Sequence, residues 1–440
     1  MHDRKWLRET RESIGEEVRC AGWISKRRDH GKLVFFDVRD RSGSVQCVVL
    51  PDAEEAYEMA KDVRAEYLVA FRGLVKERPQ KAAKEADPLG GIEIEIRELE
   101  VLSKPSVDLP VDVSQEDMGL NLDTLLNYRH LTIRNEKVRS IFELSSAVLE
   151  AYASVLRERH FSEIKSPKIL EAATEGGANF FKVHYFDREA FLAQSPQFYK
   201  QAGVGAFERV FEIGPVFRAE PHFTTRHVNE YISLDAEMGF IDGFEEVMDE
   251  LESVVMGMME RIRERELRAF GFHGTSIPES VAIPRMTLAE AVEILKKEYG
   301  KELEELDIDA EGERMIGEYA KEKYGSDFVF LTHYPVSIRP FYAMPSEDGE
   351  TTQSFDLLFR GLEIATGGQR IHRVEQLEES IRRHGLDPED FSSYLDMFRF
   401  GMPPHGGWGM GSERIVQKLL GLGSIKEAVL YPRDVKRLSP

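Results

Sequence analysis

The chain has 440 residues, of which 42% are hydrophobic and 31% charged, and its formal net charge is −21. This length is enough for a sizeable core and favours two domains over one. The apolar runs are short and periodic, and none approaches the roughly 20 residues of a membrane span, so we expect no membrane partner. The acidic charge counts weakly against a nucleic-acid partner, because a local basic stripe can exist on an acidic protein.

Cysteine use and the start of the chain bear on the cellular compartment. Cys20 and Cys47 are the two cysteines, and both lie in apolar, strand-like runs. We expect buried thiols there, in place of a disulfide or a metal site. The run Met1–Trp6 lacks the apolar stretch of a secretory signal. These features predict a cytoplasmic enzyme.

The first hundred residues have the pattern of a small barrel. The strand candidates are residues 18–24, 33–39, 45–50, 67–75 and 92–102, with a helix candidate at 53–63. Residues 92–96 alternate strictly between apolar and polar, as expected of a half-buried strand. Three strands, a helix and two strands follow the order of an OB-fold barrel, a frequent nucleic-acid platform. We predict an all-β OB-fold domain over residues 1–104, for which the resemblance given below implies anticodon binding.

The remaining chain changes character twice. Residues 105–135 contain Pro105 and Pro110 and little periodicity, which predicts a linker or hinge. From Asn135 the apolar residues fall on one broad helical face, and a strand then ends at Pro167. Later strand candidates are 209–217, 231–238, 328–333 and 355–365, and helix candidates are 244–269, 288–298 and 311–324. We predict an α+β catalytic domain with a mainly antiparallel sheet over residues 136–440.

Three blocks carry the chemistry. The first is the long helix leading into the strand that ends at Pro167. The second is residues 216–220 with the loop 224–227 and the strand through Asp235, and the third is the glycine-rich run 406–414. Each alone has an ordinary explanation, such as a surface ion pair or a turn before a helix. Together and in this order they resemble motifs one, two and three of class II aminoacyl-tRNA synthetases.

Further segments narrow the resemblance. Residues 173–177, 193–201, 367–373 and 431–434 look like segments of aspartyl-tRNA synthetases, and the similarity covers essentially the whole chain. The large extra domain of typical bacterial members is missing, so the chain resembles the archaeal and eukaryotic branch. The resemblance implies an ATP- and Mg²⁺-dependent ligase that joins L-aspartate to tRNA(Asp). It also implies a homodimer with Pro167 near the two-fold contact, and it leaves open whether tRNA(Asn) is charged too.

The resemblance assigns a nucleotide site. The aspartate carboxylate must attack the ATP α-phosphate, so positioning and charge stabilisation supply most of the rate. The candidate catalytic residues are Arg218, which resembles the arginine that grips the α-phosphate, and Arg414, which resembles the arginine that stacks on adenine. The candidate ATP-binding residues are Arg218, Ala219, Glu220, Arg226, His227, Val228, Glu363, Gly411, Ser412, Glu413 and Arg414.

Asp356, Glu363 and Thr366 are the candidate metal ligands, by the same resemblance. Magnesium prefers hard oxygen ligands, and substrate phosphates complete its coordination. On one regular strand Asp356 and Glu363 would face opposite sides, so we expect a bulge at Gly361. The alternative is two unrelated strand acids.

Aspartate needs a cationic pocket, and Lys200 and Arg370 match the two cations of the family that recognise its side chain. Lys200 discriminates best, because asparaginyl relatives usually carry an apolar residue there and a buried lysine facing a neutral amide would be poorly paired. The alternative is a solvated helix lysine. Glu175 precedes two glycines, which suits a mobile loop over the substrate. The aspartate-binding candidates are Glu175, Ser195, Gln197, Phe198, Tyr199, Lys200, Arg218, Asp235, Thr366 and Arg370.

The anticodon-binding candidates are Phe35, Gln46, Glu93 and Arg28. The first three match family residues that read the anticodon, and an aromatic ring on a barrel face can stack on a splayed base. Arg28 belongs to a basic patch, residues 26–28, that suits backbone phosphate. Phe36 is the better core candidate, because neighbours on a strand point to opposite faces.

Other functions were weighed against the aspartate–tRNA ligase. An asparaginyl-tRNA synthetase has the same fold, but Lys200 and the run 367–370 argue against it. A tRNA-independent asparagine synthetase tends to lack the anticodon domain predicted here. A catalytically inactive nucleic-acid-binding protein with the same fold is a further alternative, and it would not need the intact set Arg218, Glu220, Glu363 and Arg414.

Overall fold

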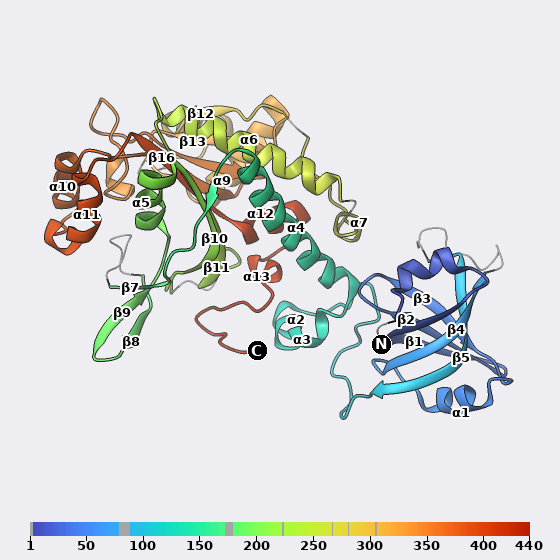
Figure 1. The fold of residues 1–440 in the computed structure, drawn as a ribbon. Coiled ribbons are helices and arrows are strands. Elements are labelled where there is room, and N and C mark those ends of the chain that lie inside the picture. The colour runs from blue at the N-terminus through green and yellow to red at the C-terminus, as the bar shows by residue number, and fades with distance from the viewer. Residues whose placement is uncertain are drawn as a thin grey trace. The chain divides into compact units, whose positions relative to one another are not determined.

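The computed structural model describes residues 3–78, 89–171, 179–221, 224–265, 267–279, 281–303 and 306–440. Glu175 therefore lies outside the described residues. The chain forms two compact units, Met1–Leu120 and Asn121–Pro440 (Figure 1). Across the described ranges, no helix combines the length and apolar character needed to cross a membrane.

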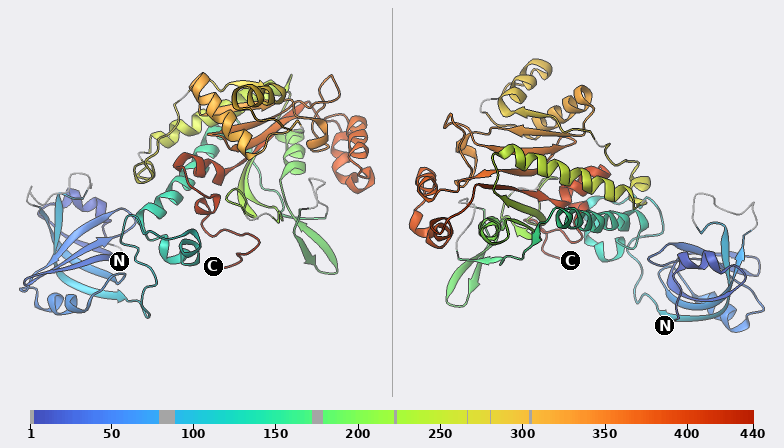
Figure 2. Two further views of the ribbon diagram at one scale, coloured as in Figure 1. Left: turned by 180° about the vertical axis from the view of Figure 1, so that it is seen from behind. Right: turned by 45° about the horizontal axis from the view of Figure 1, so that its top comes forward.

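The first unit is a closed five-stranded barrel with the strand order β1-β2-β3-β5-β4 (Figure 2). Its elements are η1 (Leu7–Ser13), β1 (Glu17–His30), β2 (Leu33–Arg39), β3 (Ser44–Val49), α1 (Glu54–Asp62), β4 (Leu68–Glu77) and β5 (Ile92–Ser103). Successive side chains of a strand point alternately into and out of the barrel. Phe36, for example, is fully buried between two half-buried neighbours. The predicted barrel is confirmed, and the short helix η1 was not predicted.

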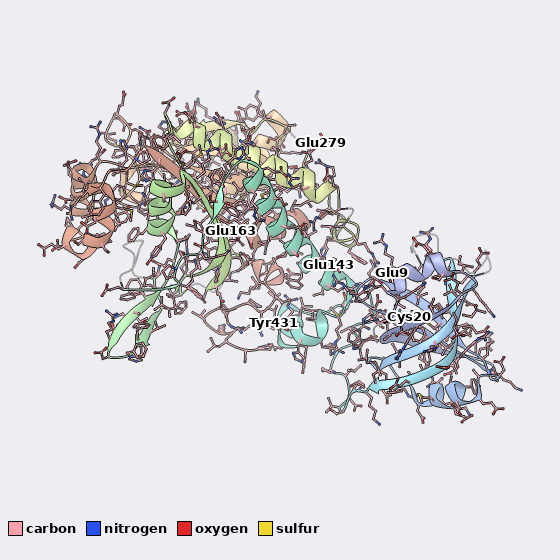
Figure 3. The ribbon with its side chains drawn as sticks, viewed as in Figure 1. Glu9, Cys20, Glu143, Glu163, Glu279 and Tyr431 are labelled. Atoms are coloured by element: carbon pink, nitrogen blue, oxygen red, sulfur yellow. The ribbon has the colours of Figure 1, made fainter. Side chains whose placement is uncertain are left out.

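The two cysteines lie inside this barrel, as the sequence predicts. Cys20 and Cys47 are buried free thiols, and Figure 3 labels Cys20 on its strand. Burial raises the pKa of the Cys20 thiol to about 12, so it stays protonated and unreactive.

The second unit is built on an eight-stranded sheet with the order β12-β13-β14-β15-β16-β11-β10-β6. The strands are β6 (Ser162–Glu163), β10 (Arg209–Phe217), β11 (Glu230–Gly239), β12 (Arg285–Thr287), β13 (Phe328–Thr332), β14 (Ser354–Phe359), β15 (Glu363–Arg370) and β16 (His405–Gly411). Among the described residues of this sheet, the pairs β6/β10 and β12/β13 are parallel and the other neighbouring pairs are antiparallel. The predicted mainly antiparallel sheet is confirmed.

Helices and a small second sheet surround the large sheet (Figure 1). The helices are α2 (Leu122–Asn127), α3 (Arg129–Thr132), α4 (Glu136–Glu158), α5 (Gln197–Phe207), α6 (Phe244–Arg263), α7 (Ala269–His273), α8 (Leu288–Tyr299), α9 (Ala310–Tyr324), α10 (Val374–Arg383), α11 (Ser392–Arg399), α12 (Ser412–Leu420) and α13 (Ile425–Ala428). The small sheet has the order β7-β9-β8, with β7 (Ile169–Leu170), β8 (Lys182–Tyr185) and β9 (Arg188–Leu192).

The two faces of the large sheet differ in chemistry. On one face Ala236, Trp408 and Ala365 are buried in the main core, where α4, α6 and α12 pack. On the opposite face the alternate residues of β11, β15 and β16 are mostly polar or glycine, as where Asp235 pairs with Gly409 across the ladder. Farther along the same face, Val329 and Leu331 of β13 pack in a second apolar core with α8 and α9. The polar stretch over β11, β15 and β16 is therefore the part of this face that is open to a site.

The segment 355–365 corrects the sequence prediction, because it is a hairpin and not one strand. Arg360 and Gly361 reverse the chain with φ angles of 47° and 70°. The expected bulge at Gly361 is also wrong, since the irregularity lies between Leu357 and Leu358. An apolar run shows its hydrophobic character but not a turn inside it, because the turn depends on local backbone angles.

Two short helices, α2 and α3, lie within the residues predicted as a linker. Arg129 is fully buried, and its Nη2 donates to the carbonyls of Lys426, Glu427 and Val429, each at 3.2 Å. These bonds satisfy carbonyls at the end of α13, where helix hydrogen bonding runs out. The long helix α4 begins as predicted, with the Asn135 side chain accepting from the amide of Val138 at 3.2 Å.

Candidate active site

A cavity of about 360 Å³ lies over the polar face of the large sheet. Its walls come from β11, β14, β15, β16, α5, α12, the loop that follows β10 and the segment 338–343. The predicted site residues that line it are Ser195, Gln197, Lys200, Arg218, Glu220, Arg226, His227, Val228, Asp235, Glu363, Thr366, Arg370, Gly411, Glu413 and Arg414. Residues far apart in the sequence thus meet in one place.

One end of the cavity holds two buried cations with two buried carboxylates. The Lys200 ammonium, on α5, donates to Asp235 Oδ1 at 3.0 Å and to the Trp408 carbonyl at 2.9 Å. It also lies 3.4 Å from Glu237 Oε2, while Arg370 Nε donates to Glu237 Oε1 at 3.0 Å. Lys200 is 1% exposed, so it is not a solvated helix lysine.

Glu237 was not among the sequence candidates, although it joins Lys200 to Arg370. Burial alone would raise its pKa, but the two cations outweigh burial and hold the pKa below its ordinary value. Glu237 therefore stays ionised at neutral pH. Its place two residues after Asp235 on a strand was a usable signal, because such residues share a face.

Gly407 lets the carboxylate of Glu237 lie against the sheet. A Cβ at this position would lie 2.1 Å from the carbonyl oxygen of Ala236 and 2.4 Å from Glu237 Oε2. No side chain fits at that distance, so the chain requires glycine there. The glycine-rich third block thus shapes the floor of the cation pocket.

His405 on β16 lies directly opposite Arg370 on β15, and its side chain is neutral. The Nδ1 of His405 is 2.8 Å from the Pro403 carbonyl, which can only accept, so Nδ1 carries the proton. Its Nε2 then accepts from Gln201 Nε2 at 2.8 Å, and Gln201 Oε1 accepts from the Tyr394 hydroxyl. Burial lowers the pKa of His405 and keeps it uncharged beside Arg370.

The other end of the cavity is more open and carries Arg218. Its guanidinium is 44% exposed, lies 3.9 Å from Glu220 Oε1 and faces the Tyr231 ring at 5.9 Å. His227 Nε2 lies 3.5 Å from Glu220 Oε2. Arg226 forms an ion pair with Glu313 of α9. These groups are placed to donate to anionic oxygens that enter the cavity.

Arg414 extends from the first turn of α12 toward Glu363. Its Nη1 donates to the Glu363 carbonyl at 2.8 Å and lies 3.4 Å from Glu363 Oε1. Burial raises the pKa of Glu363, but Arg414, Arg339 and Arg218 outweigh burial and lower it. The neighbouring Glu413 accepts from the amide of Ile232 at 3.0 Å, and burial raises its pKa to about 7.

Asp356 and Thr366 lie opposite each other on β14 and β15, so both point to the polar face. Asp356 itself does not line the cavity, because Arg339 covers it. Arg339 Nη2 lies 2.8 Å from Asp356 Oδ1, and Nη1 donates to Thr366 Oγ1 at 3.0 Å. No periodic pattern in the sequence pointed to Arg339, which follows the short helix η3 (Val336–Ile338).

Besides Asp356, four predicted residues among those the structure describes do not line the cavity. Phe198 stacks on Tyr394 with ring centroids 3.9 Å apart, inside an aromatic cluster. Tyr199 is 38% exposed on the outer side of α5. Ala219 and Ser412 lie next to residues that do line it.

The anticodon candidates share the outer face of the barrel. Arg28 lies opposite Phe35, and Gln46 lies beside Glu93 in the ladder. Gln46 Nε2 donates to Glu93 Oε2 at 3.1 Å, and Arg28 Nη2 donates to Gln46 Oε1 at 3.2 Å. Arg28 also forms two hydrogen bonds to Asp37. Phe35 is half-buried.

Comparisons with known proteins agree with this division of the chain. Residues 121–435 match the family tRNA synthetases class II (D, K and N), and residues 18–102 match the OB-fold nucleic acid binding domain family. The predicted OB-fold is thereby confirmed for the barrel.

Curated relatives match over nearly the full length. One is 46% identical over 441 residues, covering 99% of both chains, and is named aspartate–tRNA(Asp/Asn) ligase from Thermus thermophilus. Another is 47% identical, covering 97% of this chain and 96% of the relative, and carries the same name in Aeropyrum pernix. A third is 43% identical, covering 98% of both, and is named aspartate–tRNA(Asp) ligase from Pyrococcus abyssi.

A solved structure has the same fold throughout. The asparaginyl-tRNA synthetase from Pyrococcus horikoshii in complex with asparaginyl-adenylate is 33% identical. The match covers 100% of both chains with a TM-score of 0.92.

Proposed function

This chain belongs to the class II tRNA synthetases of the D, K and N group, and we propose that it is an aspartate–tRNA ligase that charges both tRNA(Asp) and tRNA(Asn). It activates L-aspartate with ATP to aspartyl-adenylate and transfers the aspartyl group to the 3′ end of the tRNA. The observation that carries the choice of aspartate is the buried pair Lys200 and Arg370 at the closed end of the cavity.

The two cations bind the side-chain carboxylate of aspartate. An arginine and a lysine together offer several N–H donors to one carboxylate, which charge-assisted hydrogen bonds favour. An amide side chain would present its own N–H donors to them and leave a buried cation poorly paired. Asp235 supplies a negative charge for the ammonium group of the amino acid, with Gln197 and Ser195 on the same wall. Glu175, a further candidate for this role, lies outside the described residues.

The open end of the cavity binds ATP. Arg218 grips the α-phosphate where the attacking carboxylate and the leaving pyrophosphate meet, and stabilises the charge that develops there. Arg414 stacks on adenine, and Glu220 accepts from the adenine amino group. Arg226 and His227 reach the remaining phosphates from the loop 224–227, and Val228, Gly411 and Glu413 line the nucleotide site.

The residues proposed for Mg²⁺ fit a cation that arrives with phosphates. Glu363 and Thr366 line the cavity, and the Asp356 Oδ1 atom is buried with no hydrogen-bond partner of good geometry among the described residues. Within the described part of the chain no three His, Cys, Asp or Glu side chains form a metal site by themselves. Magnesium commonly takes one or two carboxylates plus substrate phosphates. When bound, it would neutralise charge on the phosphates.

The outer barrel face binds the anticodon. Phe35 stacks on a base, while Gln46 and Glu93 present an amide and a carboxylate to base edges. Their mutual hydrogen bond fixes both side chains before RNA arrives. Arg28 adds a positive charge for phosphate at the edge of the same face.

The protein works as a cytoplasmic homodimer. Pro167, the motif-one residue, lies next to Ile169, which is 51% exposed, and the β8–β9 hairpin carries Phe186 at 90% exposure. Large apolar side chains that are this exposed favour burial against a second copy of the chain. Sedimentation equilibrium should give twice the chain mass of 50.3 kDa; a monomer at micromolar concentration would contradict the dimer.

The direct test is aminoacylation of tRNA(Asp) and tRNA(Asn) transcripts with labelled aspartate, with labelled asparagine as the control. Charging of both tRNAs with aspartate alone supports the proposal. If tRNA(Asp) alone is charged, the enzyme is an aspartate–tRNA ligase that discriminates against tRNA(Asn), and the part of the proposal that concerns tRNA(Asn) is wrong. Asparagine charging, or no charging by a protein that is folded, rules out the aspartate–tRNA ligase.

A further inference from the structure

Arg339 lies between the two ends of the cavity and is held on three sides. Its Cζ lies 3.8 Å from the centroid of the Tyr334 ring. Its Nη2 lies 2.8 Å from Asp356 Oδ1, and its Nη1 donates to Thr366 Oγ1 at 3.0 Å. The side chain is 13% exposed. A guanidinium this well packed occupies a defined place and does not sample many rotamers.

This place coincides with the proposed metal site. Asp356 and Thr366 are two of the three proposed metal ligands, and the guanidinium lies against the side-chain oxygen atoms of both. A guanidinium and a divalent cation compete for the same oxygen atoms. Arg339 lines the cavity whereas Asp356 does not, so a cation that enters from the cavity meets positive charge first.

The third proposed ligand has an arginine of its own. Glu363 Oε1 lies 3.4 Å from Arg414 Nη1. The two carboxylates are therefore matched by two guanidinium groups, and the site has no surplus negative charge for a metal ion. A triphosphate would change this balance, because it brings several negative charges that both arginines can bind.

We infer that Arg339 is an internal counter-ion that keeps Asp356 and Thr366 closed to divalent cations until a nucleoside triphosphate enters the cavity. The phosphates then give Arg339 another anionic partner, and the Asp356 carboxylate becomes available as the metal ion arrives with the nucleotide. Arg339 is thus a positioning residue that orders metal binding after nucleotide binding. The inference rests on the proposed ATP site.

Mn²⁺ binding to the whole protein tests this directly, by the loss of the electron paramagnetic resonance signal of free Mn²⁺. Wild-type protein should bind Mn²⁺ strongly only with α,β-methylene-ATP present. Arg339→Gln removes the competing charge, so its nucleotide-free affinity for Mn²⁺ should rise at least about tenfold. Arg339→Lys keeps the charge and should stay near the wild-type affinity, and adding Asp356→Asn to Arg339→Gln should abolish the gain.

Arg383→Gln is the matched control, because Arg383 pairs with Glu379 on the surface of α10, and it should change nothing. A folded Arg339→Gln protein with unchanged Mn²⁺ affinity would overturn the inference. If circular dichroism shows that this variant does not fold, the wild type decides: equally tight Mn²⁺ binding with and without the nucleotide analogue overturns it. Aspartate charging by the wild type, measured in parallel, tests the proposed function separately.

Discussion

At the scale of single residues, the buried cations of the substrate pocket are each paired with a buried carboxylate. Lys200 and Arg370 share Glu237, and Lys200 also contacts Asp235. Removing one member of a buried charged group costs more than a surface ion pair contributes, because the remaining charges stay desolvated. The sequence could name three of these residues by resemblance, but not that Glu237 connects them.

Lys200→Leu should lower kcat/KM for aspartate activation by about 100-fold or more, because the substrate carboxylate loses a buried cation. ATP binding should change little, since Lys200 lies at the opposite end of the cavity. Asp235 would lose its cationic partner and Glu237 would keep only Arg370, so the free energy of unfolding should fall by about 3–5 kcal/mol. ATP–pyrophosphate exchange and urea unfolding measure the two effects.

Lys168→Leu is the control for Lys200→Leu, because Lys168 pairs with the buried Glu212 at 2.8 Å and lies outside the cavity. It should lower stability and leave the KM for aspartate unchanged. Equal aspartate kinetics in both variants would remove Lys200 from the substrate pocket.

Glu413 should make stability depend on pH. Burial raises its pKa from 4.5 to about 7 in the folded chain, so the folded state retains a proton that the unfolded state releases. Stability therefore falls as pH rises from about 4.5 to about 7, by at most about 3 kcal/mol, and is constant above that range. Glu413→Gln should remove this component, and unfolding curves between pH 4.5 and 8 compare the variant with the wild type. A parallel pH dependence in both proteins would contradict the assignment.

At the scale of elements, strand alternation creates the site. Strands β11, β15 and β16 present apolar residues to α4, α6 and α12 and polar residues to the cavity. The glycines of β16 give the polar side its depth, since alternate positions there carry no side chain. A strand pattern read from the sequence predicts that two faces exist, but not which strands lie side by side.

Gly407→Ala should disrupt both packing and substrate binding. The new Cβ would overlap the backbone oxygen of Ala236, which cannot move without shifting the ladder. We expect a loss of about 1–3 kcal/mol in the free energy of unfolding and a higher KM for aspartate, because Glu237 is displaced. Chemical denaturation and exchange kinetics measure these effects.

Gly271→Ala, in α7, is the control for this strand glycine because nothing lies within 4 Å of its Cβ position. It should be neutral or stabilising, as alanine favours a helix over glycine by roughly 0.5–1 kcal/mol. A neutral Gly407→Ala would show that the strand tolerates a side chain there.

At the scale of the whole molecule, two units carry two separate tasks. The barrel unit bears the proposed anticodon face, and the larger unit bears the cavity. Each has its own hydrophobic core, so a surface substitution in one unit should leave the other folded. The net charge of −21 does not predict the charge of either proposed site, because a few arginine and lysine side chains set the local charge there.

Phe35→Ala should separate the two tasks. Loss of a stacked base costs about 1–3 kcal/mol, so kcat/KM for tRNA charging should fall roughly 5- to 150-fold. ATP–pyrophosphate exchange without tRNA should stay unchanged. Phe400→Ala, which removes a ring that is 85% exposed in the other unit, should affect neither reaction. If Phe35→Ala charges tRNA as well as the wild type does, Phe35 does not contact the anticodon.

The sequence by itself determined the class of fold, the barrel strands, the long helix from Asn135 and most of the cavity residues. These depend on local periodicity, on helix capping and on short motifs whose residues are close together in the chain. The tertiary structure alone decided that 355–365 is a hairpin, that Phe198 packs away from the cavity, and that Glu237 and Arg339 belong to the site. Such facts depend on contacts between distant segments, and a strand or loop residue carries no local sign of the side chain that it will meet.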